Sequence, residues 1–458
     1  RPKVEMPTIE NQASGPIAWT RRIVGTTFAL CSAIGLRCAA QAPVFTAADV
    51  AAAALEYNHD VLIARKALEI AENNSKPGNA GWFPTLSLNA NVNYGNNNTR
   101  LRFAGNLPPV ENPGAQNVVA ATNATLNYVV FDGLQTLFAF RRLEAVEERT
   151  EVEYRLAVEN TLLQTLLAYH EVLRAEIQLR IGRAAMELSA ERLLRAKARF
   201  ESGNAPRSEI LGAQVDLNAD SAAFANARLT LDNAKRALNR CAGGRLGENF
   251  SLDTSLKLMD EIALEPILNA AMENNVNIVL AQKRCREAEW EVKVAQSALY
   301  PRLDLTAQYG LTQQNNDAGI LLESRTFGFS GALSFRFNVF DGGRARIRIQ
   351  NAETTLKSLD LAREKARLTV EEQTRNAYAL YQTRRYLLNL ETRNAEVARE
   401  NHERLGEQFK QGTATGIQYR EAQIQWIRAQ AARENARIAL KISEIELAAL
   451  AGTLLSPQ

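Results

Sequence analysis

Apolar and polar residues alternate with a period of two in two pairs of segments along the chain. The first pair covers residues 86–94 and 123–130, and the second covers 303–311 and 327–339. This alternation predicts β-strands with one apolar and one polar face. The residues between the first two segments, up to Asn117, are rich in Pro, Gly and Asn, and we expect them to form a loop.

Strands of about ten residues with this alternation are typical of transmembrane β-barrels. A half-buried sheet of a soluble protein gives the same pattern strand by strand, so the alternation alone leaves both interpretations open. The polar positions are mostly Asn, Ser and Thr, and aromatic residues lie near the strand ends. These two features favour the barrel.

A long helical segment follows each pair of strands. From Asp132 to about Phe200 the sequence contains no proline and only two glycines, and Asp132 is a candidate N-cap. One helical face is marked by apolar residues at spacings of seven, three, seven and four, namely Leu156, Leu163, Leu166, Leu173 and Ile177. Glycine turns then lead into alanine-rich returning helices, expected at about 207–241 and 416–450. Helices of this length need lateral packing against other helices.

The chain contains an internal repeat of two similar halves. Phe131, Asp132 and Gly133 recur 209 residues later as Phe340, Asp341 and Gly342, and the same offset aligns more than a hundred residues without a gap. Upstream of the strands the offset is 217 residues, so the two halves differ in length by eight residues between the proline that precedes the first strand and the Phe-Asp-Gly motif, and we expect a variable loop there. We therefore divide the chain into a leader (1–42), a first repeat (43–245) and a second repeat (246–458). Each repeat is expected to run helix, strand, strand, long helix, long helix.

Four strands cannot close a barrel, since about eight are needed to fill an interior. An open sheet edge in lipid leaves backbone groups unpaired at a cost of several kcal/mol each. We therefore expect several copies of the chain to share one barrel, and three copies would supply twelve strands.

The amino-terminal region has the layout of a secretory signal peptide. Arg21 and Arg22 precede the uncharged segment 23–36, which is followed by small residues at Ala39, Ala40 and Ala42. The alternative is a buried helix of the mature fold. Cleavage after Ala40 fits better than cleavage after Ala42, because proline follows Ala42.

Composition argues against several classes of function. The net charge of +3 is too small for a dedicated nucleic-acid-binding protein. Three scattered histidines, His59, His170 and His402, give no metal or catalytic spacing and are expected in surface or helix-packing positions. Four cysteines are too few for a disulfide scaffold, and the sequence leaves open whether Cys241 and Cys285 pair. No phosphate-binding loop or nucleophile elbow is present, so we expect neither catalysis nor a cofactor.

The duplicated halves, the paired Phe-Asp-Gly motifs and the Leu299-Tyr300-Pro301 sequence before the third strand resemble the TolC-like outer-membrane efflux protein family. The resemblance covers nearly all of residues 47–453. It implies a mixed α and β membrane protein, a homotrimer with a 12-stranded barrel in outer-membrane lipid, continued by a long α-helical barrel in the periplasm. The implied partners are a periplasmic adaptor (membrane fusion) protein and an inner-membrane transporter, with no nucleic acid.

The resemblance also implies candidate sites at the helix tips. Some family members narrow the tunnel with an arginine and two aspartates after the second tip glycine, and these positions fall on Ala414, Gln418 and Glu421 here. The corresponding tip carboxylate of the first half is Glu209, and Arg207 and Arg420 are candidates for replacement ion pairs. Solvated helix carboxylates remain the alternative for Glu209 and Glu421. The residues expected to contact the adaptor are Gly203, Asn204, Ala205, Gly412, Thr413 and Ala414, and the alternative is that they serve only to form the turns.

Three functions are considered, of which the first is implied by the family resemblance. The first is the channel of a tripartite efflux or type I secretion system. A coiled-coil structural protein would explain the helices but neither the strands nor the duplication, and an outer-membrane enzyme lacks a visible acid/base or nucleophile cluster. The exported substrate cannot be derived from the sequence.

Overall fold

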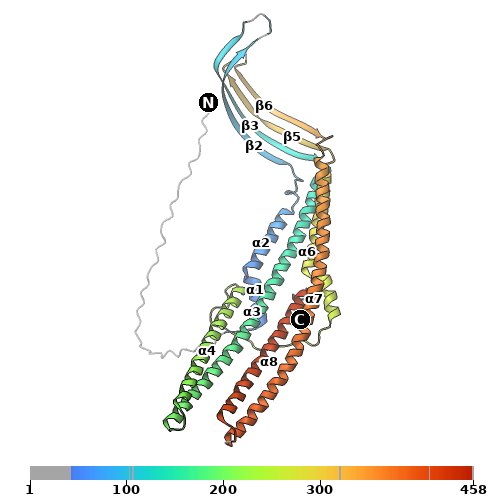
Figure 1. Cartoon of the computed structure of the whole chain (residues 1–458). Helices are drawn as coiled ribbons and strands as arrows, with labels where there is room; N and C mark the ends of the chain where they lie inside the picture. Colours follow the sequence, from blue (N-terminus) through green and yellow to red (C-terminus); the bar gives the residue numbers. More distant parts are fainter. Residues whose placement is uncertain (1–42, 103, 106–107, 319–320, 412, 456–458) are drawn as a thin grey trace, which may run out of the picture. The chain divides into compact units, whose positions relative to one another are not determined.

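The computed structural model describes residues 43–455 except 103, 106–107, 319–320 and 412. The predicted signal peptide lies outside the described residues. The first half contains β1 (Val44–Phe45), α1 (Ala47–Tyr57), α2 (His59–Asn74), β2 (Thr85–Leu101), β3 (Val110–Phe131), α3 (Gln135–Glu201) and α4 (Arg207–Cys241). The second half contains β4 (Ser251–Leu252), α5 (Leu264–Asn274), α6 (Val276–Ser297), β5 (Arg302–Asn316), β6 (Glu323–Arg336), α7 (Arg344–Lys410) and α8 (Gly416–Leu450) (Figure 1).

The internal repeat is confirmed by the order of the elements and by equivalent contacts. Each half opens with two helices rather than the single one we expected, because an asparagine begins the second helix. Asn58 Oδ1 accepts a hydrogen bond from the Asp60 amide at 2.8 Å, and its Nδ2 donates to the Cys241 carbonyl at 3.0 Å. Asn275, 217 residues later, caps the next helix in the same way and donates to the carbonyl of Leu450 at 2.8 Å.

The four long strands form one antiparallel sheet in the order β2-β3-β5-β6. Leu88 lies opposite Ala124 in the first hairpin, and their equivalents Leu305 and Leu333 lie opposite each other in the second, so both hairpins share one register. The two halves meet where β3 pairs with β5. Strands β2 and β6 are therefore the edges of this sheet.

The first hairpin is longer than predicted, and the loop expected between residues 95 and 117 is wrong for most of its length. Strand β2 continues to Leu101, and strand β3 already begins at Val110. Pro113 and Gly114 fit into the ladder at a register shift, where the Gly114 amide donates to Asn98 Oδ1 at 2.8 Å. A bulge accommodates a proline because the bulged residue is not required to donate a backbone N–H to the neighbouring strand.

The last strand is shorter than predicted. We expected a strand to Val339, but β6 ends at Arg336. In the first half the residues equivalent to 337–339, namely 128–130, are held by β5, as in the pair of Tyr128 with Leu305. The corresponding side of β6 has no partner strand among the residues described, which explains the early end.

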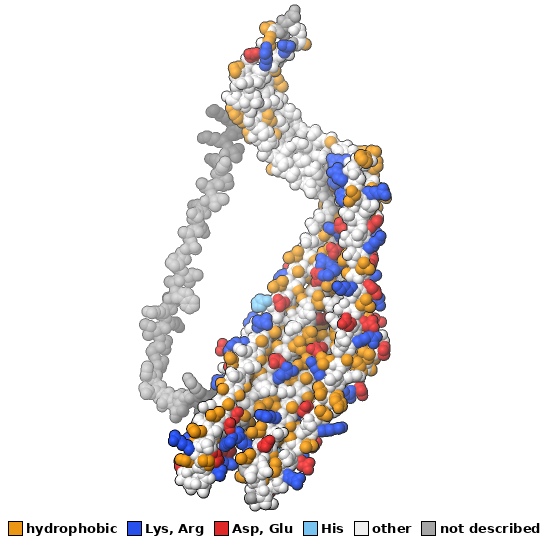
Figure 2. Space-filling model, viewed as in Figure 1, with side chains coloured by type: hydrophobic (Ala, Val, Ile, Leu, Met, Phe, Trp, Pro, Cys, Tyr) orange, Lys and Arg blue, Asp and Glu red, His pale blue; other side chains and the backbone are white. Residues whose placement is uncertain are grey.

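One face of the sheet carries an apolar row that crosses all four strands. Leu88, Ala124, Tyr309 and Phe329 lie opposite one another in successive strands, and the next row, Asn89, Asn123, Gly310 and Gly328, is polar or small. Figure 2 shows that charged side chains cover the helices, whereas the visible face of the sheet is nearly free of them between its ends. Between its ends the sheet thus carries few charged side chains, whereas the helices carry many.

The helices have the lengths that the sequence predicts. Helices α3 and α7 each span 67 residues, about 100 Å at 1.5 Å per residue, and α4 and α8 span 35 residues each. The α3–α4 and α7–α8 hairpins turn at the same end of the helices (Figure 1). Of the predicted apolar face of α3, Leu173 and Ile177 are buried in a core shared with α1, α4 and α8, which includes Val50, Leu238 and Ile438. No helix in the described ranges is both long and apolar enough to cross a membrane.

Candidate functional site

The first strand-to-helix turn is built by the Phe-Asp-Gly motif. Gly133 and Leu134 both adopt left-handed backbone conformations, with φ values of 69° and 68°, and Leu134 occupies the N-cap position of α3. Asp132, which we predicted as the N-cap, instead lies two residues before it. Its carboxylate still does the capping, because Asp132 Oδ2 accepts hydrogen bonds from the Thr136 amide at 2.9 Å and the Thr136 hydroxyl at 2.5 Å.

The second turn repeats this geometry with one difference. Gly342 and Gly343 have φ values of 72° and 82°, and Asp341 Oδ2 accepts a hydrogen bond from the Ala345 amide at 2.8 Å. In the first turn a Cβ on Gly133 would lie 2.4 Å from Tyr300 Cβ, whereas a Cβ on Gly342 would meet open space. Among the described residues, the second turn therefore lacks the neighbour that the first one has.

The first hairpin tip is closed by an ion pair. Gly203 has a φ of 75°, and the Asn204 amide donates to the Arg199 carbonyl at 2.8 Å, which ends α3. The Arg199 guanidinium lies 3.0 Å from Glu209 Oε1 across the turn. Glu209 is therefore a paired carboxylate, whereas Arg207 is exposed.

The second tip is closed by a capping box rather than an ion pair. The Thr415 amide donates to Gln418 Oε1 at 2.9 Å, and the Gln418 amide donates to Thr415 Oγ1 at 3.3 Å. The Thr413 and Ala414 amides both donate to the Gln408 carbonyl, and Gly412 lies outside the described residues. Gln418 is thus engaged in the helix start, whereas Glu421, one turn further on, is exposed.

Charged side chains link the two hairpins near the tips. Asp216 in α4 pairs with Arg192 in α3, and its Oδ2 also lies 3.8 Å from the Arg420 guanidinium in α8. A hydrogen bond and contact with Glu407 raise the pKa of the exposed Lys410 at the end of α7. Of the two arginines proposed for replacement ion pairs, Arg420 is thus the one that the structure places against a carboxylate.

An aromatic stack holds the second hairpin together above its tip. His402 lies between Tyr419 and Trp426, with ring centroids 5.3 and 4.9 Å away, and Phe409 stacks on Tyr419 at 5.4 Å. The predicted helix-packing role of His402 fits this position. Neither the stack nor the Asp216 link was predicted from the sequence.

A positional signal could have found the stack and the Arg192–Asp216 pair, although not the contact of Asp216 with Arg420. Arg192 with Asp216 and Arg199 with Glu209 each lie at equal distances on either side of Asn204, the centre of the first turn. His402 with Trp426 and Phe409 with Tyr419 do the same around Ala414. In an antiparallel helix hairpin, residues at equal sequence distances on either side of the turn face each other. Such pairs can therefore be predicted from the sequence once the centre of the turn is known.

The described part of the chain contains no cluster of His, Cys, Asp and Glu that could hold a metal ion. Cys241 and Cys285 do not pair with each other, because both are free thiols, and burial raises the pKa of each. The candidate functional features of the described residues are therefore the sheet with its two open edges, the two strand-to-helix turns and the two hairpin tips.

Comparisons with known proteins agree with this architecture. Outer membrane protein TolC of Escherichia coli is 22% identical over 383 residues, which cover 81% of this chain and 75% of TolC. Protein CyaE of Bordetella pertussis is 25% identical over 311 residues, 66% of this chain and 61% of CyaE. Among solved structures, the outer membrane channel CmeC of Campylobacter jejuni superimposes with a TM-score of 0.73 at 18% identity, covering 90% of this chain and 87% of CmeC. The outer-membrane channel OprN gives a TM-score of 0.68 at 19% identity, covering 89% of each chain.

The family comparison matches both halves of the chain separately. The model for outer membrane efflux proteins matches residues 50–244 and again residues 267–453, which together make up most of the sequence. This result confirms the resemblance inferred from the paired motifs, and the chain belongs to the outer membrane efflux protein family.

Proposed function

We propose that this protein is the outer-membrane channel of a tripartite efflux or type I secretion system, and that it passively conducts substrates from the periplasmic side to the exterior. The observation that carries the proposal is the sheet: four antiparallel strands with an apolar row on one face, open at both edges and joined directly to 67-residue helices. Strands of 14 to 22 residues exceed the 9–11 residues, roughly, that a tilted strand needs to cross a bilayer.

The channel is a homotrimer in this proposal. One copy supplies four strands and two supply eight, about the number whose interior is filled by side chains. Three copies supply twelve strands, wide enough for water, and leave no edge open in the outer-membrane lipid. The helices of the three copies then continue the barrel as an α-helical tunnel in the periplasm.

The partners are a periplasmic adaptor protein and an inner-membrane transporter, which supplies the energy. No cofactor, nucleic acid or catalytic step belongs to this function. The coiled-coil structural alternative leaves the sheet without a role, since a fibre protein has no use for strands with an apolar face exposed to its surroundings.

The hairpin tips are the proposed docking site for the adaptor. Asn204 and Thr413 are exposed at the two turns. Their side chains bond only within the turn, Asn204 Nδ2 donating to Ser202 Oγ at 3.3 Å and Thr413 Oγ1 to the Gln408 carbonyl at 3.0 Å, so both remain accessible to a partner. A photo-crosslinking residue at either position is expected to join the channel to a second periplasmic protein in cells. Crosslinks that form only between copies of this chain would contradict a docking role.

The proposed constriction is a ring of Glu421 carboxylates, because rings of carboxylates favour cations. Glu421→Ala is expected to move the reversal potential of the channel toward zero in a planar bilayer under a KCl gradient. Glu209→Ala is the matched comparison and is expected to have a smaller effect, since Arg199 already offsets the charge of Glu209. The proposed function fails if the purified protein does not conduct at all, and the ring alone fails if conduction persists with an unchanged reversal potential.

A further inference from the structure

The polar face of the sheet, which carries Asn89 and Gly310, is almost free of charge. Along the regular part of the four-stranded ladder its residues are mostly Asn, Gln, Ser and Thr. Three charged residues are the exceptions on this face, namely Arg302, Asp304 and Arg336. Arg302 is the first residue of β5 and Arg336 is the last of β6, so the charges gather at the end of the sheet that joins the helices.

Arg302 and Arg336 lie directly opposite each other in the β5–β6 ladder. Like charges at opposed positions destabilise an antiparallel pair of strands. The equivalent positions in the first half are Thr85 and Asn127, which are also directly opposed and are uncharged. The second half therefore keeps two arginines at a place where the first half forms the same ladder with neutral residues.

Asp304 offsets only one of these two positive charges. Arg302 Nε donates to Asp304 Oδ1 at 2.9 Å and to Asp304 Oδ2 at 3.0 Å. This contact uses one of the five N–H donors of the guanidinium, and the Arg302 side chain remains 45% exposed. Arg336 is exposed and forms no ion pair with any carboxylate that the structure describes. Two arginines against one aspartate leave one net positive charge per chain on this face.

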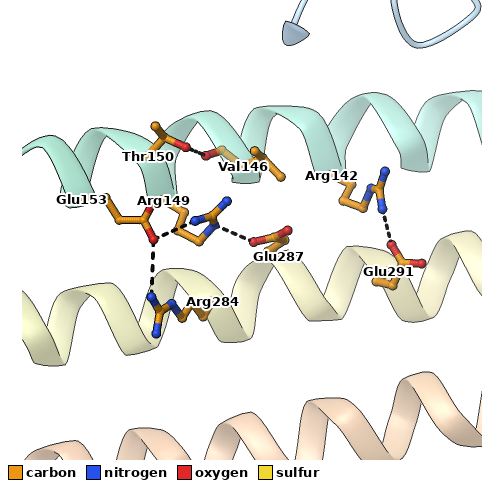
Figure 3. Close-up of polar contacts among 8 residues, drawn as sticks. All are labelled: Arg142, Val146, Arg149, Thr150, Glu153, Arg284, Glu287 and Glu291. Atoms are coloured by element: carbon orange, nitrogen blue, oxygen red, sulfur yellow. Dashed lines mark hydrogen bonds and ion pairs between the residues drawn. The ribbon is translucent and has the colours of Figure 1, made fainter. Parts of the chain in front are cut away.

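Arginines in the neighbouring helices are used differently. Arg142 lies 2.6 Å from Glu291, and Arg149 lies 2.8 Å from Glu287 (Figure 3). Both ion pairs join α3 to α6, so these arginines hold two elements of the fold together. Arg336 holds no second element in this way within the described ranges, which leaves its guanidinium available to a ligand.

We infer that Arg302 and Arg336 form a basic belt inside the pore, at the periplasmic end of the barrel, and that this arginine belt binds small polyvalent anions that carry phosphate or carboxylate groups. The inference rests on the proposed trimeric channel. It extends that proposal by assigning a class of ligand to the wall of the pore.

The face of the sheet on which the belt lies places it in the pore. The apolar row that includes Leu88 and Phe329 occupies the opposite face, which is the lipid-facing side of the proposed barrel. Arg302 and Arg336 share the face of Gly310, which then lines the water-filled interior. Lipid headgroups lie outside the barrel wall, so the ligand of the belt comes from the solution that fills the pore.

The belt selects anions by charge and by shape. With two arginines and one aspartate per chain, the proposed trimer brings six guanidinium groups and three carboxylates to one level of the pore. Rings of arginine favour anions and phosphate. The planar guanidinium matches the oxygen spacing of phosphate and carboxylate groups, and a polyvalent anion can contact more than one copy at a time. Chloride offers neither feature and binds more weakly.

The arginine belt is tested by block of the current with pyrophosphate, a polyvalent anion with two phosphate groups. The channel is placed in a planar bilayer of neutral lipid in roughly 0.1 M KCl, in which the Debye length is about 10 Å. Millimolar pyrophosphate on the exterior side is expected to reduce the wild-type current. Arg336→Gln is expected to raise the concentration for half-maximal block about tenfold, through the loss of charge-assisted hydrogen bonds.

Two variants control for charge and position. Arg325→Gln makes the same substitution on the same strand, but Arg325 lies on the opposite face and near the other end of β6, where it pairs with Gln313. It should leave the block unchanged. Arg336→Lys keeps the charge without the planar guanidinium and is expected to retain part of the block. A merely structural role for Arg336 would impair the lysine and glutamine variants alike.

Asp304→Asn tests the belt in the opposite direction. This substitution removes the carboxylate that binds Arg302 Nε and raises the net positive charge of the face. It is expected to lower the concentration of pyrophosphate for half-maximal block several-fold. A gain of this kind cannot come from a poorly folded channel, and weaker block in Asp304→Asn would contradict the belt.

The reversal potential under a KCl gradient gives a second readout. Arg336→Gln is expected to shift it toward a stronger preference for cations, which is opposite in sign to the shift expected for Glu421→Ala. A shift of the same sign in both variants would contradict an arginine belt that favours anions.

These outcomes distinguish the belt from the channel on which it rests. A wild-type protein that conducts but is not blocked, or one that is blocked as strongly after Arg336→Gln, overturns the belt and leaves the proposed channel intact. A purified protein that does not conduct removes the channel and the belt together.

Discussion

Gly133→Ala is expected to destabilise the folded chain by about 2–5 kcal/mol, the sum of a left-handed conformation for a non-glycine residue and an overpacked contact. The added methyl would lie 2.4 Å from Tyr300 Cβ and 2.8 Å from the Ser297 carbonyl oxygen. These atoms belong to the end of α6 and the turn that follows it, so relief of the clash would separate the two halves at the start of α3. The measurement is the urea midpoint of unfolding of the protein refolded in detergent, with unfolding monitored by circular dichroism.

Gly342→Ala is the matched variant, because Gly342 has nearly the same φ but open space around it in one chain. It is expected to lower the free energy of unfolding of the monomer by about 1–2 kcal/mol, the cost of the backbone conformation alone, and so to shift the urea midpoint less than Gly133→Ala does. The yield of trimer is expected to fall more strongly. Equal midpoints for the two variants would contradict the packing described for the first turn.

Leu88→Lys is expected to reduce sharply the amount of folded protein in the outer membrane. Leu88 is one of the apolar residues in the row that crosses all four strands, and a lysine on the lipid-facing side of a barrel costs about 2–4 kcal/mol near the bilayer midplane. Three copies would introduce three such charges into one barrel. The measurement is the fraction of protein in outer-membrane vesicles that shifts in mobility when heated before electrophoresis.

The control for this variant is its neighbour. Asn89→Lys adds the same side chain on the opposite face of the sheet, where a barrel interior holds water, and it should assemble as the wild type does. Equal loss in both variants would indicate that neither face of the sheet contacts lipid.

The long helices could be predicted closely from the sequence. The repeat fixes equivalent positions twice, and glycine turns mark the ends, so the returning helices begin and end at Arg207, Cys241, Gly416 and Leu450 as expected. The outer-membrane assignment and the resemblance to efflux proteins are confirmed by the family match to both halves. The repeat boundaries at 43–245 and 246–458 remain a prediction.

The strand ends could not be predicted, because pairing rather than composition determines them. The asparagines after Tyr94 indicate a loop locally, yet they stay in a strand because β3 lies alongside them, and Pro113 is accommodated by a bulge. Phe337 and Val339 alternate like strand residues but leave the ladder, because that side of β6 has no partner strand in the part of the chain that the structure describes.

The candidate sites at the tips remain proposals. The turn at Gly203 and Asn204 was predicted from the sequence, but no motif indicated which charges are paired. The structure separates the paired Glu209 from the exposed Glu421, and it adds Asp216, which no motif marked. Contacts across a helix hairpin depend on where its turn is centred, and this becomes clear only when the two helices are placed together.

The central claim is that one chain brings too few strands to seal a pore, so that copies combine theirs. It is tested most directly by native mass spectrometry of the particle that conducts in planar bilayers. Three chains per conducting particle is the predicted result. Conduction by a particle that contains a single chain would contradict the account.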